Sequence, residues 1–273
     1  MGRKQSHDGK GKLIIIGGKE DKEGDCEILE AVAREVGNGK LCIVSVASTV
    51  GDELWDIYKR VFKNLGVKKL SHLDVVQRTH KFDEKAYKAV KDATAIFFTG
   101  GDQLKITSEI GGTIIQDRIS EIYKSGGVIA GTSAGASVMG DTMMISGSSD
   151  ASYRINSGLK MAPGLGFAKN MLIDQHFAER GRIGRLLGAT AHNPKFLGIG
   201  IDENTAIVLQ DKSHFDVIGD GAVYVLDAHE ANGSNVSEAE DLTALSIFDV
   251  KLHVLVKGNH FDLVRKVASP KAP

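Results

Sequence analysis

Short apolar strands alternate with amphipathic helices over the first half of this 273-residue chain, and this alternation constrains the fold more than any other feature. Continuous β-branched, apolar runs are typical of strands that are buried on both faces. Apolar residues at helical spacing, followed by glycine, predict the helices between them. These patterns predict five strands (residues 12–16, 41–47, 70–76, 95–99 and 127–131) and four helices (residues 23–36, 53–65, 84–90 and 114–123).

The alternation predicts a parallel sheet, because strand–helix–strand units connect right-handed and place helices on both faces. The expected fold class is therefore α/β, a three-layer sandwich around a central, mostly parallel sheet. Ligands bind beyond the carboxyl ends of the strands in such sheets. Polar residues that directly follow these strands are accordingly the first candidates for a functional site.

The second half of the chain changes character and predicts antiparallel strands added to this sheet. Residues 196–209 and 214–226 look like strands around a turn at residues 211–212, and residues 248–256 and 261–264 look like another hairpin. The connections at residues 148–169 and 228–241 contain Gly, Ser and Asn; the first is long enough to favour a functional role, and the second predicts a surface loop.

The domain organisation is predicted to be simple, because the sequence has neither an internal repeat nor a clear linker. We expect one α/β domain over residues 12–267. Residues 1–11 predict a disordered N-terminal tail, and residues 268–273 a C-terminal tail.

Composition excludes several classes of protein. Hydrophobic residues make up 42% of the chain, which argues against wholesale disorder, and the formal net charge of −1 argues against a dedicated nucleic-acid binder. The apolar runs are far shorter than the roughly 20 residues of a membrane-spanning helix, and the polar N-terminus lacks a secretory signal. The two cysteines, Cys26 and Cys42, have no metal-ligand spacing. We therefore expect a cytoplasmic protein without membrane segment, metal or cofactor.

The strongest local signal is the pentapeptide Gly131-Thr132-Ser133-Ala134-Gly135, which directly follows a predicted strand. This is G-x-S-x-G in strand–turn–helix context, where a sharp turn that requires glycine lifts a serine hydroxyl above the sheet. The pattern predicts that Ser133 is a nucleophile. The alternative is a turn that merely packs tightly or holds a phosphate.

A serine nucleophile needs a base, and His176 is the best placed of the nine histidines. It follows an apolar run in Asp174-Gln175-His176-Phe177 and precedes a basic stretch. The density of charged groups after an apolar strand favours a site, although a histidine in this position could also be a half-buried, hydrogen-bonded side chain.

The base in turn needs a carboxylate that fixes its tautomer, and Glu203 closes the apolar run at residues 197–201. Adjacent residues of an extended chain project to opposite faces, so Asp202 and Glu203 cannot both face the site. By itself, the position of Glu203 favours a surface carboxylate at the end of a strand. The turn containing Gly100 and Gly101 could supply one backbone N–H of an oxyanion hole, opposite that of Ala134. The glycine-containing stretch at residues 17–22 lacks a complete nucleotide-binding pattern.

These segments together resemble the cyanophycinases of peptidase family S51, which are serine-type exopeptidases on a class I glutamine amidotransferase-like (flavodoxin-like) fold. The resemblance extends over about residues 12–263. It is carried by Gly-Thr-Ser-Ala-Gly-Ala, Gly-Gly-Asp-Gln, Asp-Gln-His-Phe with the arginines that follow, Asp-Glu-Asn-Thr-Ala, and the Gly-Gly-x-Glu-Asp-Lys opening at residues 17–22. Lys19 departs from the family pattern, because a smaller residue is expected there.

The resemblance implies Ser133 as nucleophile, His176 as general base and Glu203 as orienting acid. It implies cyanophycin as substrate, a poly-aspartate with arginine on each β-carboxyl, and β-Asp-Arg dipeptides as products. It also implies a homodimer. Six residues match substrate-pocket positions of the family: Gln103, Asp174, Gln175, Arg180, Arg182 and Arg185.

Two questions stay open at the level of sequence. The three arginines could hold substrate carboxylates in bidentate geometry while Asp174 holds guanidinium, or they could form a solvated helix face. The protein could also be an aspartyl (iso)dipeptidase of the same family, or a non-catalytic amidotransferase-like binding domain.

Overall fold

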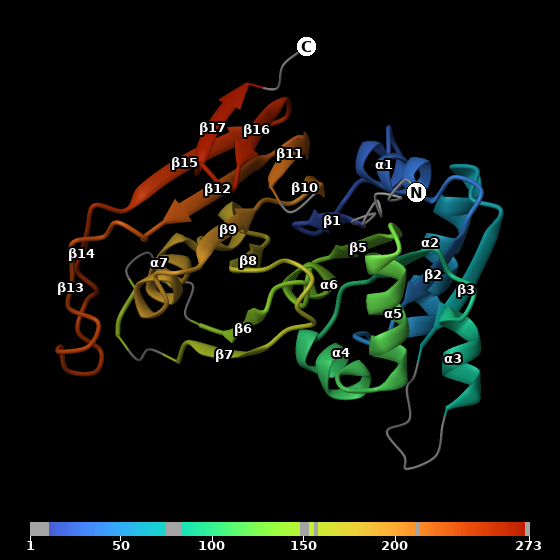
Figure 1. Ribbon diagram of the computed structural model, residues 1–273, viewed down its shortest axis with the longest axis horizontal. Coiled ribbons are helices and arrows are strands. Elements are labelled where there is room, and N and C mark those ends of the chain that lie inside the picture. The colour runs from blue at the N-terminus through green and yellow to red at the C-terminus, as the bar shows by residue number, and fades with distance from the viewer. Residues whose placement is uncertain (1–10, 75–82, 148–152, 156–157, 211–212, 271–273) are drawn as a thin grey trace, which may run out of the picture.

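The computed structural model describes residues 11–74, 83–147, 153–155, 158–210 and 213–270. Two sheets lie side by side and are covered by helices (Figure 1). The larger sheet has nine strands in the order β17-β16-β11-β10-β1-β5-β4-β2-β3. Its parallel half contains the five strands predicted from the first half of the chain: β1 (Lys12–Ile16), β2 (Lys40–Val44), β3 (Lys69–Leu73), β4 (Ala95–Phe98) and β5 (Val128–Thr132).

The other half of the larger sheet is antiparallel. It consists of β10 (Thr205–Gln210), β11 (His214–Gly219), β16 (Asn259–Asp262) and β17 (Val267–Pro270). The predicted α/β class with a mostly parallel sheet and added antiparallel strands is confirmed. Strand β17 includes residues 268–270, which the sequence assigned to a tail, because their backbone pairs with β16.

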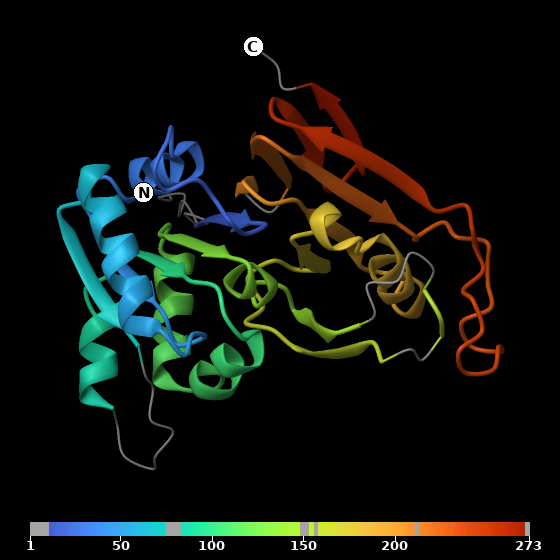
Figure 2. The same ribbon diagram turned by 180° about the vertical axis from the view of Figure 1, so that it is seen from behind.

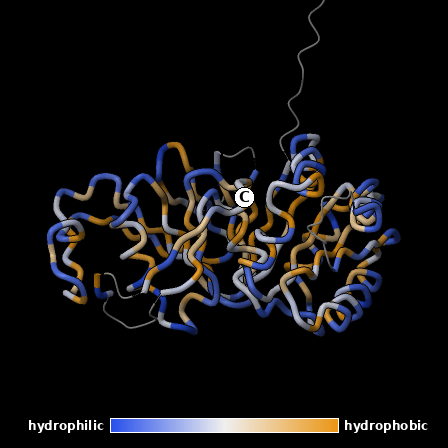
Figure 3. The backbone as a smooth tube through the Cα atoms, turned by 90° about the horizontal axis from the view of Figure 1, so that it is seen from below, coloured by the Kyte–Doolittle hydropathy of each residue, from blue (hydrophilic) through white to orange (hydrophobic). Residues whose placement is uncertain are grey.

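Helices cover both faces of the larger sheet, as the apolar residues of β1 require. Ile14 and Ile16 face one layer, formed by α1 (Glu27–Val36) and α2 (Gly51–Asn64). Leu13 and Ile15 face the other, formed by α3 (Glu84–Val90), α4 (Gln103–Ile110), α5 (Ile114–Lys124) and α6 (Ala134–Ser137). Figure 2 shows α2 on the opposite side of the sheet from α5. In Figure 3 the hydrophobic segments run through the interior, and the hydrophilic ones lie mainly at the periphery.

A second, four-stranded sheet is built by the second half of the chain. Its order is β15-β12-β9-β8, from β8 (Met171–Gln175), β9 (Leu197–Ile201), β12 (Ala222–Asp227) and β15 (Lys251–Val256). The 3-10 turn η1 (Ala178–Arg180) follows β8, and α7 (Ile183–His192) packs against the sheet. Two hairpins complete the fold, β6 (Thr142–Ser146) with β7 (Lys160–Pro163) and β13 (Gly233–Ser234) with β14 (Ile247–Phe248).

The second sheet corrects the sequence prediction for this half. Each of the two long predicted strands is in fact two strands, because the chain passes between the sheets at residues 202–204 and again at residues 220–221. The pairing of Gln210 with His214 supports the predicted hairpin, whose turn at residues 211–212 lies outside the described residues. The predicted hairpin of residues 248–256 and 261–264 is wrong, since β15 pairs with β12 whereas β16 pairs with β11 and β17.

One apolar cluster contains residues of both sheets, including Ile15, Ile173 and Ile201. That residues 12–267 form one domain stays a prediction. The predicted N-terminal tail lies outside the described residues except for Gly11, and so do parts of the predicted segments at residues 70–76 and 148–169. Each described helix is too short or too polar to cross a lipid bilayer.

Candidate active site

Ser133 lies in the sharp turn between β5 and α6. Its backbone has φ 54° and ψ −112°, a conformation that residues with side chains rarely adopt. A Cβ at Gly131 would lie 2.5 Å from the carbonyl oxygen of Gly135, and a Cβ at Gly135 would lie 2.4 Å from that of Phe98. The prediction that this turn requires both glycines is therefore confirmed.

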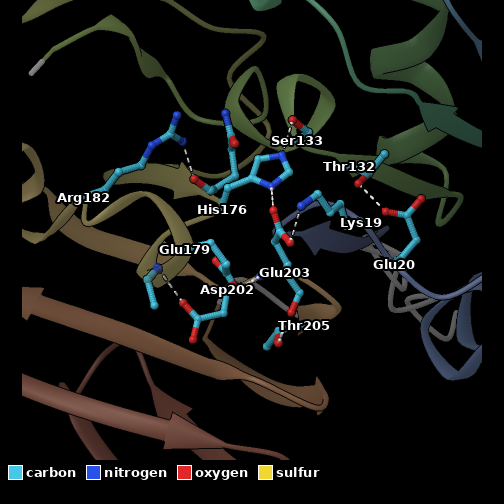
Figure 4. A network of polar contacts seen from close by, with 12 residues as sticks. Lys19, Glu20, Thr132, Ser133, His176, Glu179, Arg182, Asp202, Glu203 and Thr205 are labelled. Carbon is cyan, nitrogen blue, oxygen red and sulfur yellow. Dashed lines mark hydrogen bonds and ion pairs between the residues drawn. The ribbon is translucent and has the colours of Figure 1, made fainter. Parts of the chain in front are cut away.

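His176 follows β8 of the second sheet, and its ring faces Ser133 (Figure 4). The distance from Nε2 of His176 to Oγ of Ser133 is 3.0 Å. The backbone N–H of His176 donates to the carbonyl oxygen of Gly17 at 2.8 Å. The histidine is buried, with 6% of its surface exposed, so its ring is held between the two sheets.

Glu203 lies in the turn where the chain leaves β9 and enters β10. Its Oε1 atom lies 2.6 Å from Nδ1 of His176, which completes a hydrogen-bonded chain from serine to carboxylate. Asp202 points elsewhere, as predicted, and accepts hydrogen bonds from the backbone N–H groups of Ala178 at 2.9 Å and Ala222 at 3.1 Å.

Burial and nearby charges set the protonation states of His176 and Glu203. Burial lowers the pKa of His176; the hydrogen bond to Glu203 opposes this, and the positive charges of Arg180 and Arg182 reinforce it. For Glu203, burial raises the pKa, but hydrogen bonds from Lys19 and His176 outweigh it, and the net pKa is lowered. At neutral pH the arrangement is thus a neutral imidazole beside an ionised carboxylate, as a general base requires.

The β4–α4 turn lies close to Ser133. A Cβ at Gly100 would come within 3.5 Å of Cβ of Ser133, so this turn approaches the serine closely. Gly101 has φ 142°, and a Cβ there would lie 2.3 Å from the carbonyl oxygen of Ala47. Of the two predicted oxyanion donors, Ala134 therefore directly follows Ser133, and Gly101 lies on the neighbouring β4–α4 turn.

The predicted arginine block divides into two environments. Arg182 and Arg185 are buried, at 7% and 8% exposure, and both pair with the buried carboxylate of Asp174. Nε of Arg185 lies 2.6 Å from Oδ2 of Asp174, its Nη2 contacts Oδ1, and Nη1 of Arg182 lies 3.2 Å from Oδ1. Burial lowers the pKa of Arg182 to about 10, which still leaves it charged at neutral pH. A solvated face is wrong for these two residues, whereas Arg180 is exposed.

Two polar atoms of this region are buried without a hydrogen-bond partner among the described residues: Oε1 of Gln175 and Nε of Arg182. Buried polar atoms are normally paired, so these two atoms are open to a polar group that the described residues do not supply. Gln103 begins α4, is half-buried and donates from Nε2 to the carbonyl oxygen of Met144 at 2.9 Å. The predicted pocket residues thus come from the start of α4, from the end of β8 and from the segment that runs from η1 into α7.

Sequence reasoning missed three charged residues around the triad. Lys19 pairs with Oε2 of Glu203 at 2.9 Å, Glu20 accepts a hydrogen bond from Thr132, and Glu179 accepts one from the backbone N–H of Glu203 at 3.1 Å. Lys19 and Glu20 follow β1, the parallel neighbour of β5. Their place at the carboxyl end of the adjacent strand was the signal that could have found them.

Known proteins resemble this chain over most of its length. The family model described as "Peptidase family S51" matches residues 13–217, which is most of the chain. The chain belongs to peptidase family S51. It is therefore a peptidase, an enzyme.

Relatives of this S51 peptidase match over nearly their whole length. A cyanophycinase of Geminocystis herdmanii is 36% identical over 266 residues, covering 96% of this chain and 97% of that protein. A cyanophycinase of Trichormus variabilis is 33% identical, with coverages of 96% and 88%. The crystal structure of a peptidase from an acI-B1 Actinobacterium has the same fold, with a TM-score of 0.65 at 24% identity, covering 93% of this chain and 97% of that one.

Proposed function

We propose that this S51 peptidase is a serine-type exopeptidase that hydrolyses cyanophycin to β-Asp-Arg dipeptides through an acyl-enzyme. The observation that carries the proposal is the hydrogen-bonded chain from Ser133 through His176 to Glu203, at a strained strand–helix turn. The names of its relatives, cyanophycinases that match over most of their length, support the choice of substrate.

In the acylation step, Oγ of Ser133 attacks the scissile carbonyl carbon while Nε2 of His176 accepts the hydroxyl proton. The carboxylate of Glu203 stabilises the imidazolium that forms. The carbonyl oxygen becomes an oxyanion, and the backbone N–H groups of Gly101 and Ala134 are our candidates to bind it. When the intermediate collapses, the carbon–nitrogen bond breaks and His176 gives its proton to the leaving amine.

Deacylation repeats these steps with water. His176 accepts a proton from the water as its oxygen attacks the acyl carbon, and the same proton returns to Oγ of Ser133 when the ester bond breaks. The product leaves with a free carboxylate, and Ser133, His176 and Glu203 return to their starting protonation states.

The substrate units carry both carboxylates and guanidinium groups, and the charges beside the triad suit the carboxylates. Two buried arginines, Arg182 and Arg185, share the single carboxylate of Asp174. The cluster therefore keeps one net positive charge, with Nε of Arg182 free of partners within the described chain. We propose that a substrate carboxylate compensates this charge and that Arg180, at the exposed edge, adds a second contact. Gln103 and Gln175 would hold neutral polar groups of the same unit.

Asp174 has a different role in this proposal than direct recognition of a substrate guanidinium. Both of its oxygens accept from arginines of the chain itself. We propose that it orients Arg182 and Arg185 toward the substrate.

The deciding experiment is mass spectrometry of the products after incubation of the purified protein with purified cyanophycin. We expect β-Asp-Arg from the wild type and none from Ser133→Ala. A parallel panel of short Asp-Xaa dipeptides tests the main alternative, an aspartyl (iso)dipeptidase. Turnover of the dipeptides without release of β-Asp-Arg from the polymer would favour that alternative. No turnover of either, together with no reaction with an active-site serine reagent, would favour a non-catalytic domain.

A further inference from the structure

A single loop contacts His176 and Glu203 of the proposed triad, and also Thr132, the residue that precedes Ser133. This segment, residues 17–22, follows β1 and is here called the 17–22 loop. We propose that the 17–22 loop is the positioning element of the triad, in which Lys19 orients Glu203 and Glu20 orients the nucleophile turn through Thr132. The proposal rests on the proposed roles of Ser133, His176 and Glu203, and goes beyond them by assigning positioning residues that do not touch the substrate.

The glycines of the loop hold the histidine. The carbonyl oxygen of Gly17 accepts the backbone N–H of His176 at 2.8 Å, and that of Gly18 accepts the N–H of Asn204 at 2.8 Å. Gly18 has φ 111°, and a Cβ there would lie 2.3 Å from Cε1 and 2.5 Å from Nε2 of the His176 ring. Only a residue without a side chain lets the loop pass this close to the imidazole.

Lys19 acts on the carboxylate from the side opposite the histidine. Its ammonium lies 2.9 Å from Oε2 of Glu203, while Oε1 of the same carboxylate contacts His176 (Figure 4). Because both oxygens are engaged, rotation of the carboxylate would break one contact or the other. The side chain of Lys19 is 72% exposed and that of Glu203 only 18%, so the contact is made at the surface of the site.

Glu20, the next residue of the loop, acts on the turn that carries Ser133. Its side chain is fully buried and has three partners: the hydroxyl of Tyr58, Oγ1 of Thr132 at 2.5 Å and Nζ of Lys22 at 3.0 Å. A buried carboxylate is stable only while such partners remain, so it holds them in place. Thr132 directly precedes Ser133, and the backbone N–H of Ser133 donates to Ile16 at the end of β1. The turn that carries Ser133 is thus bonded to the loop through Thr132 and to the end of β1 through the backbone of Ser133.

The loop is itself rigidly held. The carboxylate of Asp21 accepts the backbone N–H groups of Glu23, Gly24 and Cys26 at 2.9–3.0 Å. The backbone N–H of Asp21 donates to the side chain of Asn204 at 2.8 Å, next to Glu203. These bonds fix the loop against the same turn that carries the triad acid, as a positioning element requires.

The role of Lys19 is tested by the pH profile of kcat/KM for Lys19→Ala. Removing the ammonium leaves the charge of Glu203 less compensated, which favours the imidazolium of His176. The acidic limb should therefore move to higher pH, by roughly a few tenths of a unit for one exposed ion pair. Lys19→Arg should restore the wild-type limb. The other charges near this pair, Arg180, Arg182 and Glu179, are unchanged in both variants.

A matched control for this variant is Lys169→Ala. Lys169 also forms a surface ion pair, at 2.6 Å to Asp141, and is 59% exposed, but it precedes β8 at the end of the strand away from His176. The acidic limb of kcat/KM for Lys169→Ala should equal that of the wild type. An unchanged limb in Lys19→Ala, at low ionic strength and in a folded protein, would overturn the role of Lys19.

The role of Glu20 is tested through its partner, with Thr132→Val and Thr132→Ser. Valine has the shape of threonine without the hydroxyl, so Glu20 loses its link to the turn while Tyr58 and Lys22 remain. We expect kcat to fall roughly tenfold, with KM within about twofold, because a displaced nucleophile affects the chemical step. Serine retains the hydroxyl and should restore most of kcat.

Thr190→Val is the matched control for Thr132→Val. Thr190 is a fully buried threonine of α7 whose hydroxyl donates to the backbone. The Thr190→Val protein should lose about as much stability as Thr132→Val and should keep the wild-type kcat. Wild-type kcat in a folded Thr132→Val protein would refute the role of Glu20. Activity in Ser133→Ala would instead refute the proposed function, so the two failures are distinguishable.

Discussion

Nδ1 of His176 lies 2.6 Å from Oε1 of Glu203, and this contact decides which nitrogen of the ring can act as a base. An ionised carboxylate only accepts hydrogen bonds, so Nδ1 must carry the proton. Nε2 is then left with its lone pair toward Oγ of Ser133. The tautomer that general-base catalysis needs therefore follows from the position of one carboxylate.

Substitution of the triad should separate the roles of its members. Ser133→Ala and His176→Ala should each lower kcat by roughly 10⁴-fold or more, and the double variant should be no worse, because the two act as a unit. Glu203→Gln should also lower kcat severely, but less than Ser133→Ala or His176→Ala does, since Glu203 orients the ring and transfers no proton. Steady-state kinetics on cyanophycin, with circular dichroism to verify folding, measures these effects. Additive losses in the double variant would contradict a shared mechanism.

The pH dependence of activity follows from the pKa of His176. The base must be neutral, and burial lowers its pKa. The acidic limb of kcat/KM should therefore have its midpoint below the ordinary imidazole value of about 6.5. The pKa of Glu203 is lowered as well, so the carboxylate stays ionised through this range. Initial rates over a pH series give the midpoint, and a midpoint clearly above 6.5 would argue against a buried histidine base.

Gly18→Ala should impair both stability and turnover, since a Cβ at Gly18 would collide with the ring of His176. Gly66→Ala is its matched control, because Gly66 also has positive φ, at 88°, but has no atom within 4 Å of the added Cβ. Both variants incur backbone strain of roughly 1 kcal/mol. Only Gly18→Ala should also lose kcat, measured beside thermal melting. Equal activities of the two variants would show that His176 can move aside without consequence.

The arginines should respond differently to substitution, because their surroundings differ. Arg185→Ala leaves Asp174 with fewer partners in a buried site, and we expect a loss of roughly 3–5 kcal/mol in the free energy of unfolding. Arg180→Ala should change that free energy by no more than about 0.5 kcal/mol. It should nevertheless lower kcat/KM on cyanophycin by roughly tenfold or more, as loss of a charge-assisted hydrogen bond does.

Two further measurements make the Arg180 prediction specific to substrate binding. Arg180→Lys should restore activity only in part, because an ammonium cannot make the planar, two-point contact of a guanidinium. Inactivation by a small serine reagent without carboxylates should stay near the wild-type rate. If Arg180→Ala is indistinguishable from wild type on the polymer, Arg180 does not bind substrate.

Most of the secondary structure of the first half, though not α4, was accessible from sequence, because every strand there except β3 is a largely continuous apolar run that ends near glycine or a polar turn. The nucleophile turn was accessible for the same reason: Gly131 and Gly135 mark a backbone that side chains would block. The second half was less accessible. The sequence pattern of a strand indicates that it pairs with another strand, but it does not indicate which one. Nothing in residues 196–226 therefore indicated that each long predicted strand changes sheets.

The surroundings of the arginines were also beyond the sequence. Spacing places Arg182 and Arg185 near one another on a helix, but whether that face is solvated depends on what packs against it. In the structure it packs toward β8, where Asp174 lies buried and neutralises part of their charge. Burial of charge is a property of the tertiary arrangement, since it requires a partner from another element.

The sequence alone determined the α/β class and the order of strand and helix units, and it offered Ser133 as a candidate nucleophile, because these depend on local periodicity and on turn geometry. The candidate roles of His176 and Glu203 came from the family resemblance. Only the tertiary structure decided how these three residues meet. Ser133 follows a strand of the nine-stranded sheet, His176 follows a strand of the four-stranded one, and Glu203 lies in the turn that connects the two. Contacts of 3.0 and 2.6 Å between residues 43 and 27 positions apart arise from the packing of the two sheets, which no local pattern encodes.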